Sequence, residues 1–155
     1  MPQLAKGGKN VFAWSKINNE GRLIIPEDAF KEYGFKEEET AILMSGSKKS
    51  RGFGLSRLVK FMNSPISSSV VEAHPELVSQ EIPEGETICY KSRYFCWVRI
   101  RNRSITLSAT SLRNYGIGNK GLLLAVRGSD FGIGFIVRGP IIEKARKHDE
   151  LMIYQ

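Results

Sequence analysis

The chain is 155 residues long, the size of one domain, and its 23 basic and 16 acidic side chains give a formal net charge of +7. Hydrophobic residues make up 41% of it and charged residues 25%, a composition that excludes a disordered chain. No apolar run approaches the roughly 20 residues of a membrane-spanning helix. The first residues also lack the apolar segment of a signal peptide, so a cytoplasmic protein is expected.

The basic charge is concentrated in the second half of the chain. Residues 1–80 have 11 basic and 9 acidic side chains, a net charge of +2, whereas residues 81–155 have 12 and 7, a net charge of +5. From Lys91 to Arg138, nine basic residues accompany a single acid, Asp130. Such a concentration is a plausible footprint for a polyanion, although a solvated basic surface would have the same composition.

Four short strands and one helix are predicted after a flexible basic leader, residues 1–10. Pro26 suits the first turn of the helix, Glu27 and Asp28 face its positive end, and Gly34 ends it. Aromatic and β-branched content and the intervening turns define the strands. These strands are residues 11–17, 22–25, 40–44 and 52–59.

The second half predicts a similar series after a connector. The connector, residues 60–92, contains one short helix that starts after Pro65. Further on, Ser108 is a good N-cap for a helix, and Pro140 introduces a basic terminal helix. The strands of this half are predicted within residues 87–100, 122–126 and 132–137.

The two halves share a pattern that we interpret as an internal duplication. Residues 12–34 read FAWSKINNEGRLIIPEDAFKEYG, and residues 95–116 read FCWVRIRNRSITLSATSLRNYG. Trp14 and Trp97 fall at the same place, and both segments end on Tyr-Gly. Such repeats decide a fold prediction before local propensity does. The matching positions of the two tryptophans favour core packing over stacking on nucleic-acid bases.

Glycines support the repeat at a second place. The segment Gly-Phe-Gly-Leu that begins at Gly52 matches Gly-Ile-Gly-Phe, which begins at Gly132. Glycines within a strand predict a bend or a close approach of another backbone. They are weak evidence for a nucleotide site, because neither segment follows a strand and opens a helix.

Each copy is therefore predicted as strand, strand, short helix, strand, strand. One such unit has too little surface to enclose a core, whereas two can interlock into a small barrel. The fold class expected is α+β, mainly β with short helices, in one joint domain built from two repeats. Its parts are the leader 1–10, the first repeat 11–59, the connector 60–92, the second repeat 93–138, and the C-terminal helix and tail 139–155.

One segment of the first copy resembles a known family. Residues 21–35, GRLIIPEDAFKEYGF, resemble the swapped-hairpin domain of AbrB and SpoVT transcription factors, and two tandem copies are similar to the MraZ arrangement. The resemblance implies a pseudo-two-fold β-barrel of swapped-hairpin or double-ψ type. It also implies binding of double-stranded DNA by basic side chains of the hairpin and helix, from a homo-oligomer that is a dimer or larger.

The resemblance implies DNA contacts from seven basic residues, which are Lys16, Arg22, Lys31, Arg99, Arg101, Arg103 and Arg113. Arg22 corresponds to Ser104 in the second copy, so Arg101 and Arg103 are expected to take its role there. The chain departs from the pattern at Asn18, where MraZ-like turns have an aspartate. The second copy also lacks Gly-Arg and proline, so it is either structural or uses shifted contacts. Lysine and arginine suit this role because each phosphate contact releases a counterion.

The function expected from the sequence is that of a nucleoid-associated, sequence-specific transcriptional regulator. The alternatives are a protein-interaction module, an antitoxin-like partner binder, or an enzyme on the same barrel. His74 and His148 lack metal-ligand spacing, and Cys89 and Cys96 make neither a disulfide framework nor a zinc site. No nucleophile motif with a base is visible. Catalytic residues, a metal, a cofactor and a small-molecule ligand are therefore not expected.

Overall fold

The structure, a computed structural model, describes residues 11–118 and 121–155. The predicted leader, residues 1–10, lies outside this part of the chain. The described residues form ten strands, which are β1 Val11–Lys16, β2 Arg22–Ile24, β3 Thr40–Ser45, β4 Phe53–Arg57, β5 Thr87–Tyr90, β6 Arg93–Arg99, β7 Ser104–Thr106, β8 Leu122–Arg127, β9 Ile133–Ile136 and β10 Ile153–Tyr154. They also form six helices, which are α1 Glu27–Glu32, α2 Leu58–Met62, α3 Ser67–Ala73, α4 Glu76–Ser79, α5 Ala109–Asn114 and α6 Pro140–Ala145. The predicted α+β class, mainly β with short helices, is confirmed.

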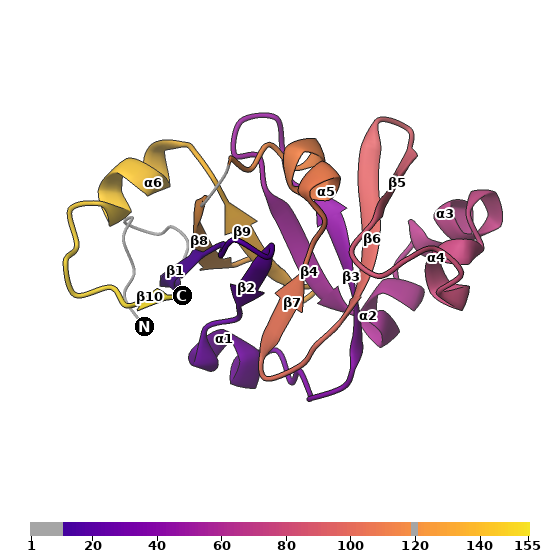
Figure 1. Cartoon of the computed structure of the whole chain (residues 1–155), viewed down its shortest axis with the longest axis horizontal. Coiled ribbons are helices and arrows are strands. Elements are labelled where there is room, and N and C mark those ends of the chain that lie inside the picture. Colours follow the sequence, from indigo (N-terminus) through magenta and orange to yellow (C-terminus); the bar gives the residue numbers. More distant parts are fainter. Residues whose placement is uncertain (1–10, 119–120) are drawn as a thin grey trace.

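Eight of the strands form one open sheet (Figure 1). Their order is β10-β1-β8-β9-β4-β3-β6-β5, and β2 and β7 form a separate two-stranded sheet. The expected closed barrel is therefore not observed. The eight-stranded sheet has two free edge strands, β10 and β5, which do not pair with each other. Strands β2 and β7 cannot bridge these edges, because they pair with each other in a separate sheet. Within residues 11–118 and 121–155, no backbone pairing closes the sheet on itself.

The six central strands, in the order β1-β8-β9-β4-β3-β6, are arranged symmetrically. Each strand of the first half has its counterpart from the second half at the same distance from the opposite end. Strand β1 pairs with β8, and β6 pairs with β3, so the first strand of each half lies against the third sheet strand of the other half. Strand β4 pairs with β9 at the centre, and β2 pairs with β7. Neither half can complete its sheet without the other. The duplication itself remains a prediction.

The helix ends follow the local signals in the sequence. Helix α1 follows Pro26 and has Glu27 and Asp28 in its first turn. Helix α5 begins after Ser108, whose Oγ accepts the backbone N–H of Ser111 at 3.1 Å, as the predicted N-cap requires. Both helices are followed by a glycine of positive φ, Gly34 at 70° and Gly116 at 74°, which ends the helix in a left-handed conformation.

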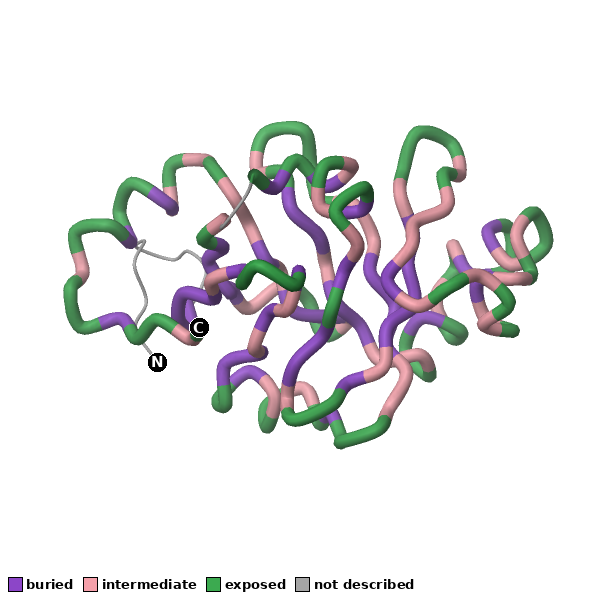
Figure 2. The backbone as a smooth tube through the Cα atoms, in the orientation of Figure 1, coloured by how far each residue is buried: buried purple, intermediate pink, exposed green. Residues whose placement is uncertain are grey.

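The core lies where the two halves meet. The ring of Phe53 on β4 lies 5.3 Å from that of Phe135 on β9 and 5.3 Å from that of Tyr115, between ring centroids. Figure 2 shows that the central strands are buried, while the loops at both ends of the sheet are exposed. Trp14 and Trp97 are only 6% and 8% exposed, so the prediction that they pack in the core is confirmed.

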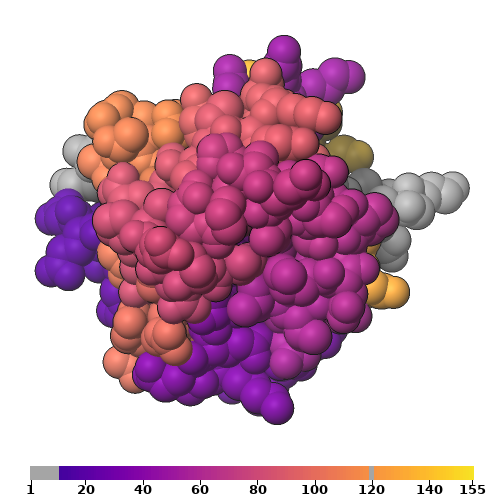
Figure 3. All heavy atoms as spheres, turned by 90° about the vertical axis from the view of Figure 1, so that its right-hand side faces the viewer, coloured from indigo at the N-terminus to yellow at the C-terminus, as the bar shows by residue number. Residues whose placement is uncertain are grey.

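Three helices, not one, cover the sheet beside β6. Helices α2, α3 and α4 bury Phe61, Val70 and Leu77 against Phe95 and Trp97. Figure 3 looks onto this end of the molecule and shows these helices as a continuous cover. The connector is therefore a packed layer, because its buried apolar side chains lie against those of β6. No helix within the described residues has the length and apolar character needed to cross a membrane.

The two cysteines differ in burial, which predicts a difference in reactivity. Cys96 is fully buried on β6, and burial raises the pKa of its thiol, whereas Cys89 is exposed on β5. Since the thiolate is the reactive form, a thiol reagent such as DTNB is expected to modify one thiol in the native protein and two after unfolding. The Cys89→Ser variant should show no fast phase. A fast phase that survives this substitution would contradict the burial of Cys96.

Close backbone approach makes glycine necessary immediately before β4 and β9, as the sequence predicted for Gly52. A Cβ at Gly52 would lie 1.9 Å from the carbonyl oxygen of Phe135, and one at Gly132 would lie 2.3 Å from that of Leu55. We expect Gly132→Ala to lower the free energy of unfolding by about 1–3 kcal/mol, because the paired backbones must separate. Gly118→Ala is the matched control, since a Cβ there would meet nothing within 4 Å.

Urea denaturation measures both variants. The control should stay within about 0.5 kcal/mol of the parent. Equal stability of the two variants would show that the halves do not approach this closely.

Candidate nucleic-acid interface

Arg22 lies in the two-stranded sheet formed by β2 and β7. Its Nε donates a hydrogen bond of 2.8 Å to Ser104 Oγ, across the sheet. The turn before it is closed by Asn18, whose Oδ1 accepts the backbone N–H of Glu20 and of Arg22, each at 2.9 Å. Gly21 is required in this turn, because its φ is 80° and a Cβ would lie 2.1 Å from the carbonyl oxygen of Leu107. Asparagine therefore closes the turn without the aspartate of MraZ-like sequences.

Arg101 and Arg103 occupy the corresponding turn before β7, and both are engaged within the protein. Arg101 Nη1 donates to both carboxylate oxygens of Glu84 at 2.9 Å. Arg103 Nε donates to the carbonyl oxygen of Ile25 at 2.9 Å, and its guanidinium lies 5.5 Å from the ring centroid of Tyr154. These contacts stabilise the turn and pair Arg101 with an acidic side chain.

The other four predicted residues are spread over the molecule. Arg99 donates to the carbonyl oxygen of Glu38 at 2.9 Å, and Lys31 on α1 forms an ion pair with Glu27 at 3.1 Å. Lys16 is half-buried at the end of β1, and Arg113 is exposed on α5. Figure 1 shows α1 and α5 at opposite sides of the sheet. The structure therefore does not bring the seven residues onto one surface.

The two helices differ in the charge around them. From Glu27 to Glu39, α1 and the loop after it have six acidic residues and two lysines. The neighbouring loop after β8 is tied to α1, because Arg127 Nε donates to Glu32 Oε2 at 2.6 Å, and this hydrogen bond holds the pKa of Glu32 below its usual value. Helix α5, in contrast, has no acidic residue.

Helix α5 belongs to a surface that we call the basic face. It consists of residues 46–51, 91–93, 109–118 and 137–139, which contain no aspartate or glutamate. The loops of this face lie together along the upper side of Figure 1. Its cations are Lys48, Lys49, Arg51, Lys91, Arg93, Arg113 and Arg138.

Hydrogen bonds and packing join these segments. The loop 46–51 meets α5, because the N–H of Gly52 donates to the carbonyl oxygen of Tyr115 at 2.8 Å and the side chain of Arg51 lies against Gly116. The Tyr115 hydroxyl donates to the carbonyl oxygen of Tyr94 at 3.3 Å, which ties α5 to the strand after Arg93. The basic face is therefore continuous across the two halves.

Arg138 attaches the last segment of the face to the loop 46–51. Its Nη2 donates to the carbonyl oxygen of Lys48 at 2.8 Å and its Nε to that of Lys49 at 3.2 Å. The carbonyl oxygen of Ser50 also accepts the backbone N–H of Arg138 at 3.1 Å. The cations of the face form no ion pair with any described acidic residue.

This face contains only one of the residues expected from the sequence, Arg113. The run GSKKSRG at residues 46–52 was a visible basic signal, but it lies outside the segment that resembles the AbrB family. The place of Arg138 on this face could not be predicted from the sequence, because the pairing of β9 with β4 is what brings it close to Lys48. Comparisons of the chain with protein-family models, with curated proteins and with solved structures find no match.

Proposed function

We propose that the protein is a transcriptional regulator that binds double-stranded DNA and that the basic face makes the principal contacts with the DNA backbone. The observation behind this proposal is that seven cations lie on four adjoining segments that contain no acidic residue of their own. Each lysine or arginine that neutralises a phosphate releases a condensed counterion, which favours binding at low salt.

The separation of charge also supports a polyanionic partner. The acidic residues from Glu27 to Glu39 lie on the other side of the sheet, so the field of the protein is positive on the basic face and opposed there by few acids. Such a field steers a polyanion toward one surface and raises its association rate. A basic surface that only contacts water has no reason to gather its cations in one place or to separate them from acidic residues.

The hairpin of the first half is a second contact surface in this proposal. Lys16 and Arg22 form no ion pair with a described acidic residue, and the hydrogen bond from Arg22 to Ser104 uses only Nε. An arginine held in this way can present its remaining donors to a base edge. Base contacts specify a sequence, whereas phosphate contacts position the protein, so the two surfaces would have different roles.

We also propose that the protein consists of a duplicated swapped-hairpin unit. The pairing of β1 with β8 and of β6 with β3 supports this, because the first strand of each half pairs with a strand of the other half. We further propose that the protein acts at the nucleoid as a homo-oligomer. Strand β5 supports this part, since its outer edge is not paired within the described sheet and could accept a second copy.

Two charge-matched triple variants test the proposal. Lys48→Ala/Lys49→Ala/Arg51→Ala removes three cations from the basic face, and Lys31→Ala/Lys36→Ala/Lys60→Ala removes three exposed cations elsewhere. Fluorescence anisotropy with a labelled duplex would be recorded across a range of salt. The slope of log K against log salt should shrink by up to about 0.9 for each lost phosphate contact in the first variant, and by much less in the second.

Three outcomes contradict the proposal. Wild-type protein that ignores duplex DNA at about 50 mM salt, where phosphate contacts are strong, removes DNA binding altogether. An equal effect of the two variants means that only net charge matters. A larger effect of the second variant moves the interface away from the basic face. Co-purification with a small protein, without DNA binding, would favour the partner-binding alternative.

Arg22→Ala tests the hairpin surface separately. If Arg22 reads a base, the substitution is expected to weaken binding to a selected operator by about 1–3 kcal/mol and to leave binding to random duplex nearly unchanged. Arg22→Lys is the control, because it keeps the charge and loses the bidentate geometry. Full affinity of the alanine variant for the operator would remove Arg22 from the interface.

A further inference from the structure

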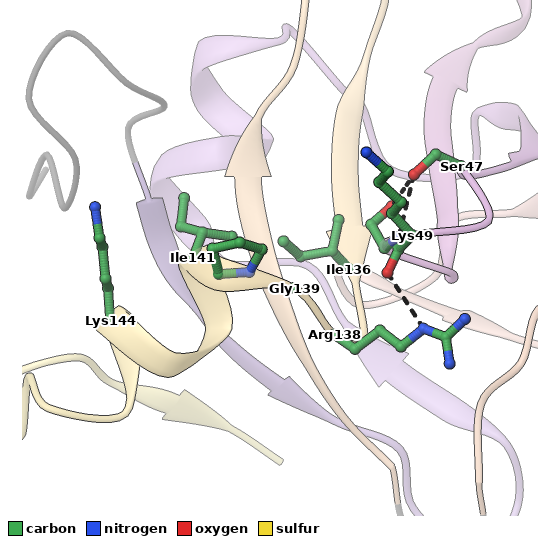
Figure 4. A pocket seen from close by; sticks show the side chains of 9 residues that line it. Ser47, Lys49, Ile136, Arg138, Gly139, Ile141 and Lys144 are labelled. Carbon is green, nitrogen blue, oxygen red and sulfur yellow. Dashed lines mark hydrogen bonds between the residues drawn. The ribbon is translucent and has the colours of Figure 1, made fainter.

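A cavity of about 380 Å³ lies between the loop 46–50 and the start of α6 (Figure 4). Its apolar part is formed by Ile136, Pro140 and Ile141. In Figure 4 the side chains of Ile136 and Ile141 lie between Lys144 on one side and the loop with Ser47 and Lys49 on the other. Nothing in DNA binding as proposed above requires an apolar cavity at this place.

The walls of the cavity are held by specific contacts. The backbone N–H groups of Val137 and Arg138 donate to the carbonyl oxygen of Ser50 at 3.0 and 3.1 Å. The guanidinium of Arg138 turns toward the loop, where it binds the carbonyl oxygens of Lys48 and Lys49. On the opposite wall, Pro140 starts α6 after Gly139, whose φ is 123°. These contacts fix the position of both walls of the cavity.

The polar groups of the cavity are cations and hydroxyls. Lys49 and Lys144 stand at its two ends, and their ammonium groups lie toward the same side of the view in Figure 4. The hydroxyls of Ser47 and Ser50 lie 2.9 Å apart on the loop wall. The described lining residues include no carboxylate, and Glu143 of α6 is paired with Arg146 at 3.0 Å.

This combination selects a particular class of ligand. A fully polar anion would gain nothing from the apolar wall, and a neutral apolar molecule would gain nothing from the lysines. The volume lies near the lower limit of the roughly 300–1,000 Å³ of small-molecule sites. We propose that the cavity binds a small organic acid, with its apolar body against Ile136 and Ile141 and its carboxylate toward Lys49 or Lys144. This inference does not depend on DNA binding.

Octanoate is a suitable probe, and calorimetry on the wild-type chain detects its binding directly. Trp14 offers a second readout, because it packs in the same cluster as Ile136 and Ile141. Octanoate is expected to bind saturably at one site and to change the tryptophan fluorescence. Octanol, which lacks the charge, and inorganic phosphate, which lacks the apolar body, should each bind at least tenfold more weakly.

Two variants connect the binding to the cavity. Lys49→Ala/Lys144→Ala should weaken octanoate binding at least tenfold without changing octanol binding. Ile141→Asp, which puts a carboxylate on the apolar wall, should abolish octanoate binding. Val59→Asp is the control, because Val59 is 51% exposed on α2 and does not line the cavity. Thermal unfolding would check that each variant is folded.

The inference is overturned by any of four results. These are the absence of saturable octanoate binding, equal affinity for octanol, equal affinity for phosphate, or a loss of binding in Val59→Asp as large as in Ile141→Asp. Saturable binding of octanoate that both cavity variants weaken, and the control does not, supports it.

Discussion

The exchange of strands between the two halves is the constraint on which the rest of the structure depends. The first strand of each half, β1 or β6, finds its partner in the other half, and β4 meets β9 at the centre. At this centre Gly54 faces Gly134, and the neighbouring glycines leave no room for a side chain. Since these pairings join distant parts of the sequence, folding must bring both halves together before the sheet of either is complete.

The two halves build one core together, but their exposed surfaces differ in charge. Helix α1 reads EDAFKE and α5 reads ATSLRN, although both sit at the same place in their halves. The loop after β3 contains three cations, whereas the loop after β8 contains Asp130. Core positions are limited by packing, whereas surface charge is not. The proposed binding surface lies where the two halves differ in charge, and it spans both of them.

The parts of the fold that depend on local chemistry could be predicted from the sequence. The helix stops at Gly34 and Gly116 and the cap at Ser108 require only neighbouring residues, and the matched positions of Trp14 and Trp97 indicated burial. The open sheet could not be predicted, because whether a ladder closes depends on the register of strands far apart. Of the three helices α2, α3 and α4, only the one after Pro65 was predicted, because serine and proline interrupt the apolar pattern of this segment.

The candidate site was less predictable than the fold, for an electrostatic reason. The sequence does not show which acidic residue lies near a given lysine or arginine. Whether that basic residue is free to bind a ligand depends on the acids that the fold brings close to it. Glu84 reaches Arg101 across 17 residues, and Arg138 reaches the carbonyl oxygen of Lys48 across 90. The family resemblance indicated a hairpin of cations, whereas the structure pairs several of these within the protein and leaves other cations exposed.

The central claim is that the basic face contacts duplex DNA, and amide NMR of the protein with and without a short duplex tests it most directly. The account predicts that the largest chemical-shift changes fall in residues 46–51, 91–93, 109–118 and 137–139, and that they disappear at high salt because the contacts are to phosphates. Shift changes confined to α1 and the loop 36–39, or none at low salt, would contradict it.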